Sequence, residues 1–434
     1  MNSTAFDAIV IGCGPGGSSA ATFLARAGKR VLVLEKEIFP RFHIGESLLP
    51  CNMTIFREMG VLPALQAAGF PQKLGARFEL GNGTISTRFA FRLGKYNREP
   101  EAIQVERAVF DHVLLKHARA AGADIREGWQ VKKFSSDANG VDIEATDPDG
   151  KSHTFHAAYL IDASGRGNVT GNQEGLRVMH PKHKKLAVFA HYTGVLRNQG
   201  EEINDIIIVR LDNKWFWIIP IGPEKTSVGL VIDPAEFAKE KGTPQEVLER
   251  WIEATPTVKE RMANARRVSE MHTTSDFSYY NRRLVSDRLL RVGDAAGFMD
   301  PIFSAGVFLA MWSGKLAAET IVHAIATGKP GGRRFEQYEK RVRNSLKQYW
   351  RMVENYYTTP FMELFLNPRE HMNLFSAVIG LLAGYFEGGW ALRWRIEYFF
   401  LLVRIQSRWP IVPRLSFRPI RVVTKESPAC ATQG

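Results

Sequence analysis

Three glycines near the start of the chain have the spacing of a phosphate-binding turn. Gly12, Gly14 and Gly17 follow an apolar run at residues 6–11 and precede a segment with the apolar period of a helix. In such a turn the first glycine permits a tight bend, the second lets the backbone approach a pyrophosphate, and the third lets helix and strand pack closely. The N–H groups at the start of the helix attract phosphates. The pattern therefore predicts a dinucleotide site.

An acidic residue completes the same unit. Residues 30–35 are predicted to form a second buried strand, and Glu35 ends it. A carboxylate there accepts hydrogen bonds from a ribose and disfavours a 2′-phosphate. A glycine-rich turn alone is a weak signal, but strand, turn, helix, strand and acid occur here in register, which favours a nucleotide-binding α/β fold. The unit does not separate NAD from FAD.

A tryptophan-rich segment is the second candidate for chemistry. Residues 215–220 have the sequence WFWIIP, which is typical of a strand that carries Trp215 and Trp217 on one face and ends at Pro220. A packed sheet face would account for the same composition. The residues alone therefore leave both interpretations open.

Two kinds of structure must position these groups. Apolar periodicity predicts helices over residues 106–121 and 234–265 and from 306 to the tail, whereas short strands dominate from 185 to 233. We expect a discontinuous dinucleotide-binding domain (1–180 and 270–330, with 60–105 on the substrate side), an antiparallel-sheet substrate domain (181–269) and a helical C-terminal region (331–434).

The composition is that of an ordinary globular protein. The 434 residues are 45% hydrophobic and 24% charged. Cys13, Cys51 and Cys430 lie too far apart for a disulfide framework or a metal-ligand motif, which predicts a reducing, cytoplasmic location and no metal site. No apolar run reaches the length of a membrane span, and the first predicted strand leaves no room for a secretory signal.

The net charge of +12 is unevenly placed. Residues 389–425 contain seven arginines and one lysine against one glutamate, interleaved with aromatic side chains. Such a segment could make a weak contact with an anionic membrane surface or an acidic protein. We favour a solvated final helix whose other face packs on the core. No recognised nucleic-acid motif accompanies the charge, so nucleic acid is not expected as a partner.

Two further segments resemble the flavin monooxygenase superfamily. Residues 288–301 (RLLRVGDAAGFMDP) resemble its second FAD fingerprint, in which the aspartate matching Asp294 holds the ribityl chain. Residues 159–165 (YLIDASG) resemble the strand and turn that return the chain to its FAD domain. The resemblance implies a Rossmann-like FAD-binding domain of the glutathione-reductase type. It also implies FAD contacts from Arg41, Glu46, Ser47, Arg107, Pro301, Ala305 and Gly306.

The chain is more specifically similar to the flavin-dependent halogenases, over roughly residues 6–405. The family's WxWxIP signature is complete at 215–220, and residues 298–306 match its FxxPxxSxG pattern. Residues 45–50 (GESLLP) match the segment that precedes the family's lysine, and residues 69–76 (GFPQKLGA) resemble the lysine segment itself. The resemblance makes Lys73 the candidate catalytic residue.

The resemblance implies a reaction in which a separate reductase supplies FADH2. With O2, chloride or bromide is then converted to hypohalous acid, which Lys73 positions or binds as a haloamine before an electron-rich carbon takes the halogen. Trp215, Trp217, Pro220 and Phe303 would wall the active site. The halide would lie against backbone N–H groups of Ser304, Ala305 and Gly306.

Phe303 stands where tryptophan halogenases carry a catalytic glutamate. This departure argues against free tryptophan and favours phenolic, pyrrolic or carrier-tethered substrates, because a good nucleophile needs no catalytic acid. Ala305 also replaces a hydroxyl residue that is common at the family's halide site, although a backbone site needs no side chain. A general base could come from His191, Tyr279 or Glu79, and the sequence does not choose among them.

Three other interpretations stay open at this stage. A flavin monooxygenase that hydroxylates or epoxidises its substrate would share the FAD segments, as would a flavin-dependent reductase of prenyl chains. A non-enzymatic FAD-binding protein is the third. The particular substrate, its regiochemistry, the halide and the oligomeric state are not indicated by the sequence.

Overall fold

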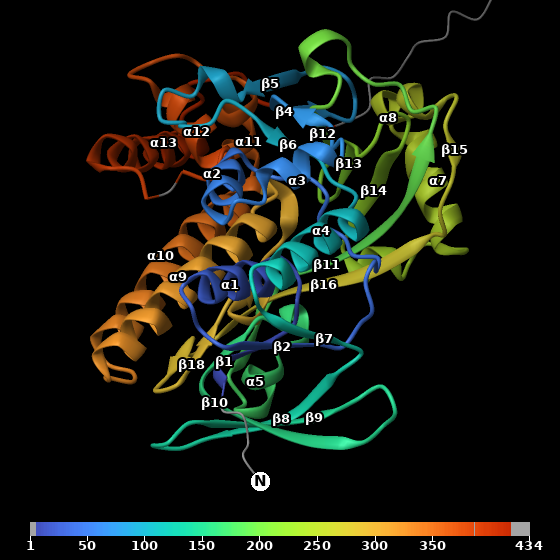
Figure 1. Cartoon of the computed structure of the whole chain (residues 1–434). Helices are drawn as coiled ribbons and strands as arrows, with labels where there is room; N and C mark the ends of the chain where they lie inside the picture. The colour runs from blue at the N-terminus through green and yellow to red at the C-terminus, as the bar shows by residue number, and fades with distance from the viewer. Residues whose placement is uncertain (1–5, 386, 418–434) are drawn as a thin grey trace, which may run out of the picture.

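Two β-sheets organise the chain, in a computed structural model that describes residues 6–385 and 387–417 (Figure 1). The first has eight strands, with β7, β2, β1, β10 and β18 side by side in parallel. Its strands are β1 (Phe6–Ile11), β2 (Val31–Glu35), β7 (Asp124–Glu127), β8 (Gln130–Ser136), β9 (Val141–Thr146), β10 (Ser152–Asp162), β17 (Val285–Ser286) and β18 (Leu289–Arg291).

Both faces of this parallel sheet are covered. Ala8 and Val10 of β1 belong to the core shared with helices α1 (Pro15–Arg26) and α4 (Arg107–Ala120), whereas Ile9 and Ile11 pack with the β8–β9 hairpin. Burial on two sides explains why β1 and β2 are apolar at nearly every position rather than at alternate ones. The predicted strand, turn, helix and strand of the dinucleotide unit are confirmed.

The second sheet has nine strands and carries the tryptophan segment. Its pairs are antiparallel except β12 with β4, which run in parallel. Strands β4 and β5, which precede the other strands of this sheet in the sequence, are added at its edge next to β12. The strands are β4 (Gly75–Leu80), β5 (Ser86–Ala90), β11 (Arg177–Thr193), β12 (Ile206–Arg210), β13 (Trp215–Pro220), β14 (Thr226–Ile232), β15 (Arg266–Arg267), β16 (His272–Asn281) and β19 (Gly297–Phe298).

Strand β13 shows the predicted alternation. Trp215 and Trp217 pack into the main core, whereas Phe216 and Ile218 pack on the opposite side, in the core that contains Leu248 of helix α7 (Pro244–Ala254). The strand's two faces thus serve two different environments. The remaining short strands, β3 (Gln72–Lys73) and β6 (Ala102–Ile103), form a separate two-stranded pair.

Helices fill the rest of the described molecule, and Figure 1 shows α9 (Gly306–Thr327) and α10 (Arg333–Tyr356) running beside both sheets. The described chain from Gly306 to Arg408 is mostly helical, as predicted. The helices are α2 (Pro50–Met59), α3 (Leu62–Ala67), α5 (Val169–Gln173), α6 (Pro234–Phe237), α7 (Pro244–Ala254), α8 (Pro256–Met262), α9 (Gly306–Thr327), α10 (Arg333–Tyr356), α11 (Thr359–Leu366), α12 (Leu374–Leu382) and α13 (Trp390–Arg408).

The final described helix, α13, has one packed and one solvated face. Leu392, Ile396 and Phe399 are buried, whereas Trp390 is exposed. This is the arrangement that the sequence favoured for the basic segment. Residues 418–425 of that segment, and Cys430, lie outside the described residues. No helix of the described chain is long and apolar enough to cross a membrane.

Gly17 tests how closely helix α1 must approach β1. A Cβ atom added at Gly17 would lie 1.9 Å from the carbonyl oxygen of Gly12, which is backbone and cannot move aside. We expect Gly17→Ala to destabilise the protein by roughly 3 kcal/mol or more, because overpacking of a rigid contact forces backbone shifts. The midpoint of urea unfolding measures this. Gly222→Ala is the matched control, since its Cβ would make only a 3.6 Å contact with Lys225. Equal midpoints for the two variants would contradict the account.

Candidate active site

A cavity of about 670 Å³ is lined by residues of both sheets and of helix α9. Its lining joins the turn after β1, the end of β2, the tryptophan face of β13 and the start of α9. Of the predicted site residues, those that line it are Gly12, Gly14, Glu35, Arg41, Glu46, Ser47, Arg107, Trp215, Trp217, Asp294, Pro301, Phe303, Ser304, Ala305 and Gly306. Gly17, Lys73 and Pro220 are not among its lining residues.

The glycine turn forms one end of the cavity. Gly12 adopts φ of +91°, and a Cβ there would lie 2.6 Å from the carbonyl oxygen of Ala163, so only glycine fits. Gly14 is the N-cap of α1, whose first N–H groups have no partner within the helix. This end of the cavity suits a pyrophosphate.

Glu35 lies beside the turn and is oriented by two backbone amides. Cys13 N donates to Oε2 at 2.6 Å, and Glu37 N donates to Oε1 at 2.9 Å. Burial raises the pKa of the Glu35 carboxyl, although these two hydrogen bonds act in the opposite direction. A carboxylate has room for further donors, so Glu35 can also accept from a ribose hydroxyl.

Two arginines that line the cavity, Arg41 and Arg107, are both held by one carboxylate, which the sequence analysis did not single out. Asp111 of α4 is fully buried, receives two hydrogen bonds from Arg107 at 2.8 and 2.9 Å, and receives one from Arg41 at 2.9 Å. Burial alone would raise the pKa of Asp111, but the Arg107 charge and hydrogen bonds, with Arg41, outweigh it and lower the pKa. Arg107 also donates to the carbonyl oxygens of Ile44 and Gly45, which shapes the turn before Glu46.

Asp294 also lines the cavity, in the segment that resembles the second FAD fingerprint. Burial raises the pKa of Asp294 to about 6, partly offset by Arg166 and Arg107. Its carbonyl oxygen accepts a hydrogen bond from Tyr279 Oη at 2.7 Å. The glycine cradle, the helix N-terminus, the two arginines and the two acids that line the cavity are groups of the kind that FAD needs. The contacts of Glu35 with a ribose and of Asp294 with the ribityl chain stay predictions.

Lys73 is buried beside this cavity rather than in its wall. Its side chain is only 1% exposed, and Nζ donates to Ser47 Oγ and to the carbonyl oxygen of Leu48, both at 2.9 Å. Nζ also lies 5.3 Å from the centre of the Phe91 ring. Burial lowers the pKa of Lys73 to about 7, partly offset by the charge of Asp205. An amine with that pKa is partly neutral, and therefore nucleophilic, at neutral pH.

The segment before α9 turns the helix N-terminus toward the cavity. Ser304 adopts a left-handed conformation with φ of +57°, and α9 starts two residues later at Gly306. Its first N–H groups have no partner within the helix, so this end of the cavity attracts an anion. Phe303 is buried against the aromatic rings of Phe78, Tyr356 and Phe365.

The tryptophan wall, which consists of Trp215 and Trp217, is fixed by a hydrogen bond from each indole N–H group. Trp215 Nε1 donates to Tyr357 Oη at 2.9 Å, and Tyr357 Oη donates to Asp300 Oδ2 at 2.6 Å. Trp217 Nε1 donates to Ser227 Oγ at 3.0 Å. Satisfied indole N–H groups hold both rings in one orientation. Tyr357 and Asp300 were not singled out from the sequence, because only the fold brings them to Trp215.

The three candidate bases lie in different places. His191 Nε2 is 2.7 Å from Glu46 Oε1, and both side chains are buried. Glu46 lines the cavity, and its Oε2 is buried without a hydrogen-bond partner in the described chain. This oxygen can therefore accept a hydrogen bond from a molecule bound in the cavity. Glu79 is paired with Arg261 at 3.1 Å, and Tyr279 is bonded to Asp294. None of the three lines the cavity directly, but His191 reaches it through the Glu46 carboxylate and Tyr279 through the backbone carbonyl of Asp294.

Comparisons with known proteins agree with this geometry. The FAD binding domain family matches residues 5–353. A 1H-pyrrole-2-carbonyl-[peptidyl-carrier protein] brominase of Pseudoalteromonas luteoviolacea is 35% identical over 74% of this chain and 78% of its own. A 1H-pyrrole-2-carbonyl-[peptidyl-carrier protein] chlorinase of Pseudomonas fluorescens is 28% identical over 88% of this chain and 90% of its own.

Solved structures of flavoproteins have the same fold as this chain. The flavin-dependent brominase Bmp2 superimposes with a TM-score of 0.83 at 30% identity, covering 93% of this chain and 100% of that one. A flavoprotein/dehydrogenase from Cytophaga hutchinsonii gives 0.86 at 28% identity, covering 93% and 99%.

The fold and the cavity thus define an FAD-dependent oxidoreductase. Within that class, the chain belongs to the flavin-dependent halogenases. The fold class, the cofactor and the halogenase function predicted from the sequence are confirmed at that level.

Asp111 tests whether the buried arginine pair holds the cofactor. In Asp111→Asn an amide replaces the charge that fixes Arg41 and Arg107, and loss of a charge-assisted hydrogen bond costs about 1.5–3 kcal/mol. We expect FAD affinity to fall by about 10- to 100-fold, measured by titrating the apoprotein and following flavin fluorescence. Asp124→Asn removes an exposed carboxylate of β7 and is the control. Unchanged FAD affinity in a folded Asp111→Asn protein would show that the arginines hold their positions without it.

Proposed function

We propose that the protein halogenates an electron-rich aromatic ring, pyrrolic or phenolic, that is attached to a carrier protein. Lys73 is the proposed catalytic residue, and a separate flavin reductase is the proposed source of FADH2. When bound and reduced, FAD supplies the electrons with which O2 and a halide yield an electrophilic halogen. The observation that carries the proposal is the buried amino group of Lys73, next to the flavin cavity but outside it.

The position of Lys73 supports a role between the FAD cavity and a separate place where the substrate would bind. Its amino group contacts Ser47, which lines the FAD cavity, and Phe91, which does not. Hypohalous acid that leaves the cavity near Ser47 would meet this amine before any substrate. The amine would hold the oxidised halogen by hydrogen bonding, or by an N–halogen bond formed with loss of water. Either path keeps the reactive halogen away from bulk solvent.

The start of α9 supports a halide site. Ser304, Ala305 and Gly306 line the cavity, and the helix N-terminus there carries positive potential. Ala305 provides no hydroxyl, so its backbone N–H would serve instead. A halide there would lie in the same cavity as the flavin.

The surroundings of Phe303 bear on the class of substrate. The position is apolar and enclosed by aromatic rings, so it supplies no acid to assist attack on a weakly nucleophilic carbon. A pyrrole or phenolate is reactive enough without one. The two relatives named above act on a pyrrole held by a peptidyl carrier protein. The net charge of +12 would attract an acidic carrier.

The test is a bromination assay with NADH, a flavin reductase, FAD, O2 and bromide. The paired substrates are pyrrole-2-carbonyl on a carrier and free pyrrole-2-carboxylate, and mass spectrometry detects the bromine isotope pair. We expect a brominated carrier-bound product that needs the reductase and falls as salt rises, because salt screens the attraction between carrier and enzyme. Equal bromination of the free acid would contradict the carrier proposal. An oxygenated product formed by direct NAD(P)H oxidation without halide would contradict the halogenase.

A further inference from the structure

An irregular stretch of strand β11 carries two histidines away from the flavin cavity. In its pairing with β16, Met179 faces Tyr279 and Lys184 faces Phe277, so β11 advances five residues while β16 advances two. The surplus residues form a bulge that contains His180, Pro181 and His183. Proline lacks the N–H needed for a continuous ladder, and a bulge re-aims the side chains that it carries. Here both imidazoles are brought to one place.

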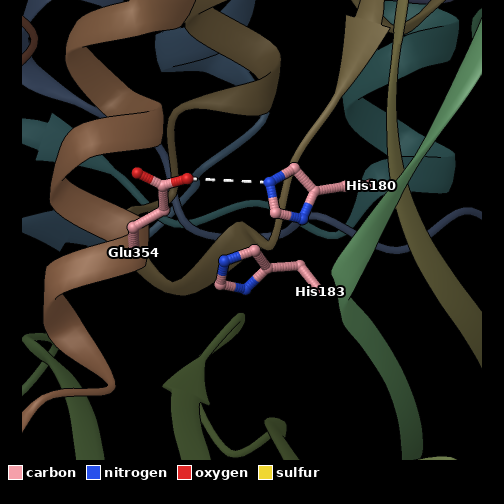
Figure 2. Close-up of side chains that lie close together, drawn as sticks. All are labelled: His180, His183 and Glu354. Atoms are coloured by element: carbon pink, nitrogen blue, oxygen red, sulfur yellow. Dashed lines mark ion pairs between the residues drawn. The ribbon is translucent and has the colours of Figure 1, made fainter.

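A carboxylate from a distant helix meets these two rings. Glu354 lies near the end of α10, and its Oε1 is 3.6 Å from His180 Nε2. Figure 2 shows the Glu354 carboxylate turned toward the His180 ring. One ligand atom from each of His180, His183 and Glu354 lies within 4.8 Å of the others. The His180 ring also stacks on Trp350, one turn before Glu354, with 4.8 Å between ring centres. The three groups therefore converge from two elements far apart in sequence.

We propose that His180, His183 and Glu354 bind a divalent transition-metal ion, with Zn²⁺ as the best fit. Two imidazoles and a carboxylate with a water in the fourth position are a recognised zinc ligand set. Zinc bonds of about 2.0–2.1 Å place tetrahedral ligand atoms roughly 3.3 Å apart. The pair at 3.6 Å is close to that distance, and the Glu354 side chain, 52% exposed, has room to turn toward an ion.

One neighbouring cation already has an ion-pair partner. Lys185 follows the bulge, but its Nζ is bound to Asp233 Oδ1 at 2.8 Å and lies 4.3 Å above the Tyr357 ring. Neutral imidazoles carry no charge of their own, and the Glu354 carboxylate supplies one negative charge. The sequence analysis expected no metal site because it considered cysteine spacing, whereas this set combines a short histidine pair with a residue about 170 positions later.

The ion would fasten the second sheet to helix α10 next to the tryptophan wall. His183 and Tyr357 have ring centres 6.1 Å apart, and Tyr357 holds both Trp215 and Asp300 by hydrogen bonds. A metal bridge between β11 and α10 would restrict movement of α10 relative to the sheet, and so would keep Tyr357 in place. The inferred role is structural support of the site, separate from transfer of the halogen.

Isothermal titration of ZnCl2 into tag-free, FAD-loaded protein freed of metal by a chelator tests the site. We expect one ion bound per chain. Loss of merely an outer partner of a metal ligand weakens affinity by about 10- to 100-fold, so His183→Ala, which removes a ligand, should weaken it by more than about 100-fold. Glu354→Gln keeps the shape of a half-exposed side chain and should weaken binding at least about tenfold.

His323→Ala is the control, because it removes an exposed histidine on α9 and should leave Zn²⁺ affinity unchanged. Absence of binding to the unaltered protein would overturn the site. Zn²⁺ binding that survives both His183→Ala and Glu354→Gln would overturn it as well. If His183→Ala fails to fold, Glu354→Gln decides alone, since its side chain lies at the surface.

Discussion

Burial of one amino group, that of Lys73, is the constraint on which the arrangement of the site depends. A cation-forming side chain that is 1% exposed needs acceptors, and it finds Ser47 Oγ and the carbonyl oxygen of Leu48. Lowering its pKa from 10.5 to about 7 corresponds to a free energy on the order of 5 kcal/mol. The rest of the fold must supply that stability. It follows that the segment around residues 45–50 must stay fixed relative to β3.

The same constraint gives the stability of the protein a pH dependence. Between pH 7 and pH 10.5 the unfolded chain holds a proton on Lys73 that the folded chain has released. Stability rises with pH wherever the unfolded state binds more protons, so this group makes the protein more stable as pH rises through that window. Below about pH 7 both states carry the proton, and the full cost of burying the charge remains. The proposed role of Lys73 in halogen transfer would account for a residue that costs stability in this way.

The two sheets provide two different parts of the site, a turn that suits a nucleotide and a wall of tryptophan side chains. The parallel sheet ends in the glycine turn and Glu35, which suit a nucleotide, and the second sheet presents Trp215 and Trp217 from β13. Helix α9 brings its N-terminus to the cavity between them, and Tyr357, just after α10, fixes the tryptophan wall. In the proposed function the flavin and the halide therefore share one cavity, whereas Lys73 lies outside its lining.

The elements near the glycine turn could be predicted from sequence because local periodicity and turn chemistry determine them. Lys73 could not be found that way, since most lysines are solvated and only the resemblance of its flanking residues indicated it. Asp111 was missed because a carboxylate four residues after Arg107 is typical of an exposed helix pair, whereas here both are buried. Glu46 and His191, and Trp215 and Tyr357, are separated by more than a hundred residues, and only the folded chain brings them together.

The most direct measurement compares Lys73→Met with the unaltered protein in single turnovers of supplied FADH2, following flavin oxidation and brominated product together. Methionine keeps the packing and removes the amine, and Lys151→Met, at an exposed turn, is the control. The account predicts unchanged flavin oxidation, a loss of brominated product of at least about 100-fold, and a product yield in the unaltered protein that rises with pH through about 7. Bromination by Lys73→Met at the unaltered rate would contradict it.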